Sequence, residues 1–289
     1  MIWPDFSVII VTKNRYHQLS ESINFICNNT IKPKNIITID GSIKRNKYFI
    51  SLIKSICDKS KINLKYIYSY ENLAQCRNIG ILKVNTKYFG FIDDDQYVSN
   101  TWVSNVKNIF STSQKIDVLI GPLSSRYLKN YWNLIWNDIN EYQLKTKGKV
   151  NFAPGANTCY KTSFLKQNHI YFDKRFTFAA EDWGISYLLN KSNAFMYQTP
   201  RLTVPHDCRK TIFSFMKQWF SYGIGIHQYH YYYLLKKENI FINKLSVIKL
   251  LFSSYPIYPN GKKPYLYFGY IVLNLSYLAG YLKSLILLK

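Results

Sequence analysis

The sequence predicts an α/β fold: a mixed, mainly parallel sheet flanked by helices, followed by a C-terminal extension that is helical, basic and rich in Tyr. Short apolar runs rich in Val and Ile alternate with stretches of helical periodicity over residues 6–92. Polar residues follow directly after three of these runs. The end of the chain differs in composition, because residues 208–289 hold 11 Lys and Arg but only one acid, Glu238. We therefore expect a first domain over 1–210 and an extension over 211–289.

The first part of the chain alternates strands with helices. A run of Val and Ile predicts a buried strand at 6–11, and Leu19, Ile23 and Ile26 then repeat at helical spacing. The further expected strands of this part are 35–39, 64–70 and 88–92. The expected helices are 16–28, 47–58 and 74–83. Strands that alternate with helices pair in parallel, and a parallel sheet binds its ligands at the carboxyl ends of its strands.

The rest of the chain is less regular. Strands are expected at 117–120, 157–160 and 202–204. A short helix expected at 181–190 begins with two acids, which suits the helix dipole. Near the end, residues 265–288 are apolar with one charge, Lys283, and are long enough to cross a bilayer. The Tyr, Asn and Ser residues of this segment favour contact with a membrane interface, and a helical cap packed on the first domain is the alternative.

The composition excludes several classes of protein. With 38 Lys and Arg against 16 Asp and Glu, the formal net charge is +22, and 47% of the residues are hydrophobic. That apolar content excludes a disordered polyelectrolyte, and the single long apolar segment excludes a polytopic membrane protein. The charge implies a negatively charged partner: nucleic acid, a phosphorylated substrate or an anionic membrane surface. Five widely spaced Cys without a C-x-x-C pair, and an N-terminus unlike a signal peptide, predict a cytoplasmic location.

Three adjacent aspartates, Asp93, Asp94 and Asp95, follow the strand expected at 88–92. Asp93 and Asp95, separated by one residue at a strand end, can hold a hard divalent cation such as Mg²⁺ or Mn²⁺. Such a cation neutralises a diphosphate and acts as a Lewis acid for a phosphate leaving group. A polar turn is the alternative, but three neighbouring carboxylates repel one another when nothing offsets their charge. We therefore favour a metal site.

Five further residues carry candidate chemistry. One carboxylate of the pair Glu181-Asp182 can act as a general base in a cleft, although acids at a helix start often cap the helix. His206 is either a structural histidine or a third metal ligand beside the aspartates. Arg77 suits diphosphate binding, with a surface salt bridge as the alternative. Gly155 lets the backbone approach a sugar closely, or it forms a turn.

In their order along the chain, these motifs resemble the family 2 glycosyltransferases of the GT-A fold, which are inverting enzymes that use nucleotide-activated sugars. The resemblance covers roughly residues 6–225 and rests on several ordered segments rather than one. The segments are Ser7–Arg15, Ile39-Asp40-Gly41-Ser42, Ala74–Gly80, the D-x-D element in Phe91–Asp95, Gly155-Ala156-Asn157, Phe172-Asp173-x-x-Phe176 and Glu181-Asp182-Trp183.

The resemblance implies a metal-dependent transfer of one sugar from a nucleotide-diphosphate sugar, most commonly UDP-linked, with inversion at the sugar. It implies Asp182 as the catalytic base, with Glu181 beside it, and Mn²⁺ or Mg²⁺ held by Asp93, Asp95 and His206. The implied donor-binding residues are Thr12, Asn14, Arg15, Asp40, Arg77, Asp93, Asp94, Gly155 and Asn157. The implied acceptor is a hydroxyl of a glycan or lipid-linked glycan in the synthesis of cell-surface polysaccharide or lipopolysaccharide.

One departure from the family pattern indicates which kind of transfer to expect, and two other classes of protein are alternatives to a glycosyltransferase. The Q-x-x-R-W motif of processive members is absent, since the nearest segment is Met216-Lys217-Gln218-Trp219, so we expect single-sugar transfer. A nucleic-acid-binding protein would use the +22 charge, but it needs no cluster of acids. A sugar nucleotidyltransferase is the other alternative, although residues 12–15 lack the glycine-rich loop of those enzymes. We expect an enzyme that contacts the anionic cytoplasmic face of a membrane peripherally.

Overall fold

The computed structural model describes residues 1–235 and 263–287. Its strands are β1 Ile2–Thr12, β2 Lys32–Asp40, β3 Asn63–Tyr68, β4 Tyr88–Phe91, β5 Val118–Ile120, β6 Leu123–Ser125, β7 Gly148–Lys149, β8 Thr158–Lys161, β9 Met196–Gln198 and β10 Val204–His206. Its helices are α1 Tyr16–Cys27, α2 Lys47–Lys59, α3 Leu73–Leu82, α4 Trp102–Thr112, α5 Tyr131–Lys145, α6 Thr162–Gln167, α7 Glu181–Lys191, α8 Ile212–Tyr229 and α10 Tyr267–Leu287. Three short helical turns are η1 Pro200–Leu202, η2 His230–Leu235 and η3 Pro264–Leu266. Of the extension expected at 211–289 and the apolar segment expected at 265–288, residues 236–262 and 288–289 lie outside the described residues.

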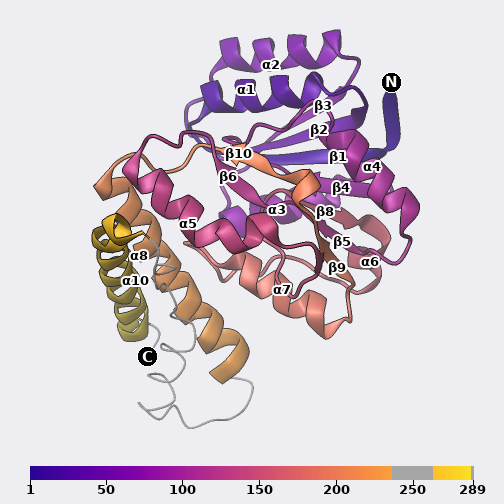
Figure 1. Cartoon of the computed structure of the whole chain (residues 1–289). Coiled ribbons are helices and arrows are strands. Elements are labelled where there is room, and N and C mark those ends of the chain that lie inside the picture. The colour runs from indigo at the N-terminus through magenta and orange to yellow at the C-terminus, as the bar shows by residue number, and fades with distance from the viewer. Residues whose placement is uncertain (236–262, 288–289) are drawn as a thin grey trace.

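Eight strands form one sheet in the order β3-β2-β1-β4-β8-β5-β9-β7. The first four strands of this order pair in parallel, as do β5 and β9. In contrast, β8 runs antiparallel to both of its neighbours, and β7 runs antiparallel to β9. Helices α1 and α2 cover one face of the sheet, while α3 and α7 lie on the other (Figure 1). The predicted α/β fold with a mixed, mainly parallel sheet is confirmed.

Strand β1 illustrates how the sequence builds a core on both faces of the sheet. Its side chains alternate, so Val8 and Ile10 join the hydrophobic cluster under α1, α2 and α4, while Ile9 joins the cluster with α3 and α7. Ile9 meets α3 at Gly80, where an added Cβ would lie 2.5 Å from Ile9 Cγ2. Because Gly80 has no side chain, α3 packs close to the sheet. This packing brings Arg77, three residues earlier on α3, to the ends of the strands.

The structure differs from the sequence-based expectation after residue 92. The strand expected at 202–204 is instead the turn η1 followed by β10, which begins at Val204 and includes His206. Parallel pairing with β6 sets this register, because Val204 lies opposite Leu123 and His206 opposite Ser125. Helices α4 and α5 were not predicted. The apolar residues of α4 do repeat at helical spacing, whereas the buried residues of α5 are mostly polar.

The C-terminal helices α8 and α10 lie side by side at one edge of the molecule (Figure 1). They approach so closely that a Cβ added to Gly223 would lie 2.0 Å from the carbonyl oxygen of Tyr277. A third hydrophobic cluster joins Ile135 of α5 to Trp219 of α8 and Tyr277 of α10. The boundary expected at residue 210 therefore does not separate two independent cores, because this cluster takes residues from both sides of it.

Candidate active site

A cleft of about 950 Å³ opens at the carboxyl ends of β1 and β4. Thr12 ends β1 and Asp93 follows β4, and both residues line the cleft. The facing wall is built by α8 and α10, which contribute Gln218, Trp219, Tyr222, Ile226 and Tyr277. The site thus lies between the carboxyl ends of these strands and the C-terminal helices.

Arg77 lies in the wall of this cleft and is only 4% exposed. Its Nη1 forms a hydrogen-bonded ion pair with Oε1 of Glu181, and its Nη2 lies 3.6 Å from Oδ1 of Asp93. Burial alone would lower the pKa of Arg77, but the carboxylates of Glu181, Asp93 and Asp182 outweigh it and raise that pKa. A Cβ added to Gly155 would lie 2.6 Å from Nη2, so a glycine is required for the guanidinium to occupy this place. Arg77 is therefore a fixed positive charge beside the first aspartate.

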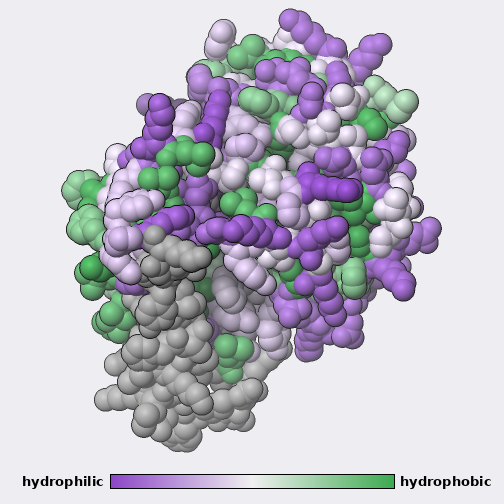
Figure 2. All heavy atoms as spheres, viewed as in Figure 1, coloured by the Kyte–Doolittle hydropathy of each residue, from purple (hydrophilic) through white to green (hydrophobic). Residues whose placement is uncertain are grey.

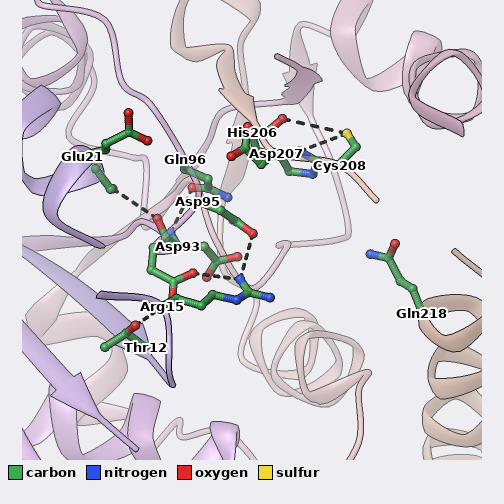
Figure 3. A network of polar contacts seen from close by, with 12 residues as sticks. Thr12, Arg15, Glu21, Asp93, Asp95, Gln96, His206, Asp207, Cys208 and Gln218 are labelled. Atoms are coloured by element: carbon green, nitrogen blue, oxygen red, sulfur yellow. Dashed lines mark hydrogen bonds and ion pairs between the residues drawn. The ribbon is translucent and has the colours of Figure 1, made fainter. Parts of the chain in front are cut away.

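Arg15 and Thr12 hold two of the three aspartates (Figure 3). The hydroxyl of Thr12 donates a hydrogen bond of 2.7 Å to Asp94, and Nη1 of Arg15 lies 2.9 Å from both Asp94 and Asp95. Burial raises the pKa of Asp94 to about 7, an effect that Arg15 and Thr12 oppose and that the charge of Asp95 reinforces. Asp94 thus binds protein groups, and the carboxylates on either side of it line the cleft.

The three predicted metal ligands, Asp93, Asp95 and His206, all line the cleft, but they are not gathered around a common point. Over residues 1–235 and 263–287, no group of three His, Cys, Asp or Glu side chains is arranged to hold a metal ion. Nδ1 of His206 lies 3.2 Å from Sγ of Cys208, and Asp95 pairs with Arg15. The donor chemistry still fits Mn²⁺ or Mg²⁺, since two carboxylates and an imidazole face one cleft. Desolvation and the neighbouring Asp95 also raise the pKa of Asp93 despite Arg77, and a bound cation would relieve this repulsion.

Asp182 stands in the first turn of α7, on the wall of the cleft next to Arg77. Ala180, just before the helix, adopts the left-handed conformation with φ of 67°, and the backbone N–H of Trp183 donates a 3.0 Å hydrogen bond to Asp182. Burial, then the charge of Glu181, raises the pKa of Asp182 to about 7, although Arg77 opposes the shift. A carboxylate with such a pKa can accept a proton near neutral pH. Its neighbour Glu181 is already engaged by Arg77.

The sequence pattern of Glycosyl transferase family 2 matches residues 7–168, which is 162 of the 289 residues. The chain belongs to this family. The match covers the opening strand, the three aspartates and the segment around Gly155, but not Asp182 or the C-terminal helices. The protein is therefore a glycosyltransferase, as the order of its motifs predicts.

The chain is also similar to relatives of known name. The "Minor teichoic acid biosynthesis protein GgaB" of Bacillus subtilis (strain 168) is 31% identical over 124 residues, which is 41% of this chain but only 13% of that protein. The S. aureus TarS 1–349 structure in complex with UDP-GlcNAc has a TM-score of 0.57 at 14% identity, over 96% of this chain and 90% of that one. "Mannosyltransferase PcManGT from Pyrobaculum calidifontis in complex with GDP-Man and Mn2+" has a TM-score of 0.62 at 11% identity, over 98% and 87%. At such identities these two structures show that the glycosyltransferase has the GT-A fold, as predicted.

Three residues predicted to bind the donor, Asp40, Asn14 and Asn157, do not line the cleft of this glycosyltransferase. Asp40 is fully buried and accepts hydrogen bonds from the hydroxyls of Tyr66 and Tyr16, at 2.8 and 3.1 Å, and from the backbone N–H of Ser42. Asn14 is exposed with φ of 58°, and its backbone N–H bonds to the hydroxyl of Ser42. Asp40 therefore holds the turn after β2, and the glycine that follows it reaches the cleft.

Asn157 is a clear departure from the expected donor site. Its side chain is 1% exposed, accepts a hydrogen bond from the indole of Trp102 and donates to the carbonyl oxygens of Leu202 and Pro122. Its φ of 54° is a left-handed conformation that Asn tolerates better than most residues. The structure thus corrects the prediction: Asn157 ties the loops behind the cleft together, because buried carbonyl groups need a donor.

Sequence reasoning missed several residues of the cleft. The indole ring of Trp136, on the unpredicted helix α5, lies 5.0 Å from the ring of His206. Cys208 also lines the cleft, as does Tyr222 on α8. For Tyr222 the only available signal was the dense aromatic content of the tail, which does not indicate which rings face the sheet.

Proposed function

We propose that this glycosyltransferase transfers a single sugar, with inversion, from a nucleotide-diphosphate sugar to a hydroxyl of a glycan or lipid-linked glycan. The observation that carries the proposal is Asp182, a carboxylate whose pKa is about 7, in the same cleft as Arg77 and Asp93. UDP is the favoured carrier, because TarS is described in complex with UDP and with UDP-GlcNAc. The naming of GgaB as a teichoic acid biosynthesis protein favours an acceptor in cell-surface polysaccharide synthesis.

The residues of the cleft take separate roles in the reaction. Asp182 takes the proton of the acceptor hydroxyl as that oxygen bonds to the anomeric carbon, and the bond from this carbon to the diphosphate oxygen breaks. Arg77 supplies a fixed positive charge toward the departing diphosphate. When bound, Mn²⁺ or Mg²⁺ held by Asp93, Asp95 and His206 would neutralise the diphosphate as a Lewis acid. Attack from the side opposite the leaving nucleotide inverts the sugar.

Thermal unfolding with added nucleotides tests the donor site directly. We expect UDP with Mn²⁺ to raise the melting temperature of the full chain more than GDP, dTDP or ATP does, because ligands that bind only the folded state stabilise it. Asp95→Asn should lose this shift, whereas Asp58→Asn, an exposed carboxylate on α2, should keep it. The absence of a shift with any nucleotide, together with tight and salt-sensitive binding of RNA, would overturn the proposal.

Product analysis tests the chemistry. Incubation with UDP-GlcNAc or another UDP-sugar and a glycan acceptor should give one added sugar per acceptor, and proton NMR should show the anomeric configuration opposite to that of the donor. Retained configuration, or polymer formation, would contradict a single displacement.

We propose the cytoplasm as the site of this reaction. The five cysteines of the chain are all free and buried, so the fold needs no oxidising compartment.

A further inference from the structure

Helix α10 carries a continuous apolar surface that faces solvent. Its members recur at helical spacing and are between 45% and 69% exposed: Phe268, Ile271, Leu275, Leu282 and Ile286, here called the α10 stripe. Hydrophobic side chains gather along the edge of the molecule where Figure 1 places α10 (Figure 2). An exposed apolar surface of this length on a folded protein indicates a binding partner.

The opposite face of α10 packs against α8 and α5. A Cβ added to Gly280 would lie 2.0 Å from the carbonyl oxygen of Phe220, so α8 and α10 meet backbone to backbone. The hydroxyl of Tyr270 donates a 2.6 Å hydrogen bond to the buried carboxylate of Asp138 on α5. By length and composition alone, residues 264–287 could cross a membrane. Crossing would strip α10 from α8 and from Asp138, leaving that carboxylate without its Tyr partner.

The charge around the stripe points to an anionic surface. Neither α8 nor α10 contains an Asp or Glu, while Lys217 and Lys283 are exposed on them. The ammonium of Lys283 lies 5.5 Å from the ring of Phe220, so this side of α8 adjoins the stripe. One turn and two turns before Phe220, α8 exposes Met216 and Phe213, the latter at 80%. Two copies of a chain with net charge +22 would repel each other across this surface, which disfavours self-association.

We propose that the α10 stripe, extended by Phe213 and Met216, lies in the plane of an anionic membrane surface and does not span it. The apolar side chains would enter the interface between headgroups and acyl chains, and the lysines would contact the lipid phosphates. The other side of α8 bears Gln218, Trp219 and Tyr222, which line the cleft. If the function proposed above holds, an acceptor carried on a lipid would reach the cleft along α8 without leaving the membrane surface.

Vesicle flotation tests the docking without any sugar donor. The full chain, without detergent, should float with vesicles of equimolar phosphatidylcholine and phosphatidylglycerol, and much less with phosphatidylcholine alone or at high salt. The double variant Ile271→Asp/Leu275→Asp should lower the partition coefficient about tenfold or more, since it removes two apolar side chains from the interface. The matched control is Leu82→Asp, a leucine on α3 that is 64% exposed and should leave binding unchanged.

Further readouts test whether the variants are folded and what occupies the stripe. Equal circular dichroism and thermal unfolding of both variants and the parent would show that the fold is intact. Alkaline carbonate should release the protein from cell membranes, and its retention there would overturn in-plane binding. Binding by the double variant that equals the parent's would overturn the role of the stripe, as would a dimer in light scattering with no vesicle binding. Sugar transfer to a soluble acceptor, assayed separately, would survive loss of docking, so the two proposals fail independently.

Discussion

The guanidinium of Arg77 on α3 and the carboxylate of Glu181 on α7 form a buried ion pair between residues 104 positions apart in the chain. The pair fixes the first turn of α7 against α3. Because Asp182 is the next residue, the same pair determines where the proposed base stands. Its Glu181 carboxylate raises the pKa of Asp182, and its Arg77 guanidinium opposes that shift. One contact thus links the fold, the electrostatics and the proposed chemistry.

Removing one partner of this pair should lower the stability of the folded protein. Glu181→Gln leaves the guanidinium of Arg77 with less compensating charge in a buried place, and we expect the free energy of unfolding to fall by about 3–5 kcal/mol. Urea denaturation measures this change. The control is Glu141→Gln, in an exposed ion pair with Lys145, which should change the free energy of unfolding very little. Equal effects of the two variants would show that the buried pair has no special role.

Gly155 should be intolerant of a methyl group because of Arg77. Gly155→Ala places a Cβ 2.6 Å from Nη2 of Arg77, and the displaced guanidinium should lower kcat/KM by about 10–100-fold. In an Arg77→Lys background, which lacks the clashing group, the added methyl should have a much smaller effect. Steady-state kinetics of the four proteins measures the coupling. Strictly additive effects would refute the steric explanation.

The pH dependence of the reaction should report Asp182. Since a general base must be deprotonated, kcat/KM should rise about tenfold per pH unit in acid and level off above pH about 7. Asp182→Asn should lower kcat/KM by about 10²–10⁴-fold and abolish this limb. Asp58→Asn is the control for the pH profile. A limb that persists in the Asp182→Asn variant would assign the titration to another group.

The carboxyl of Asp182 should make the free energy of unfolding fall as pH rises. Its folded-state pKa, about 7, is above the unfolded value, so the folded state binds more protons at intermediate pH. Between the unfolded pKa of about 3.9 and pH about 7, the parent should therefore lose stability relative to Asp182→Asn. Denaturant unfolding of both proteins across this range measures the difference. If the parent instead gained stability relative to Asp182→Asn as pH rises, the prediction would be wrong.

Arg15 should compete with a metal ion for Asp95. Its guanidinium lies 2.9 Å from that carboxylate, so Arg15→Gln should free Asp95 and strengthen binding of Mn²⁺ in the absence of donor. Isothermal titration calorimetry measures the affinity. Arg126→Gln is a matched control, because Arg126 pairs with Glu21 and Asp207 instead. Weaker binding in the Arg15→Gln variant would indicate that Arg15 supports the metal site.

The contact between α10 and α5 should stabilise the whole protein. Tyr270→Phe removes one of the two hydrogen bonds that described residues donate to the buried carboxylate of Asp138, the other coming from Lys263 at 2.9 Å. We expect a loss of about 1–3 kcal/mol in the free energy of unfolding. Tyr267→Phe, in which the tyrosine is 46% exposed, should have little effect. An equal loss in both variants would argue against the Asp138 contact.

Local patterns predicted the elements near the N-terminus well, because those elements depend on residues close in sequence. The strand expected at 35–39 and the helix expected at 47–58 correspond to β2 and α2, with ends that differ by at most three residues. The turn at 200–202 and helix α5 were missed, since their conformations depend on Asn157 and on α10. The three aspartates of the cleft were identified for the same reason as β2: their position at a strand end follows from the alternation of elements.

By itself, the sequence determined the alternation of strands and helices, the family and the set of acids at the strand ends. Only the tertiary structure decided which partner each charged or amide side chain takes. Arg77 pairs with Glu181, Arg15 with Asp94 and Asp95, and the Asn157 amide with Leu202. These contacts join residues between 45 and 104 positions apart. They form because a buried polar group that lacks a hydrogen-bond partner destabilises the folded protein. Hydrophobic periodicity reports only on residues that are close in the sequence, so it does not predict such distant pairings. They can be identified only in the folded structure.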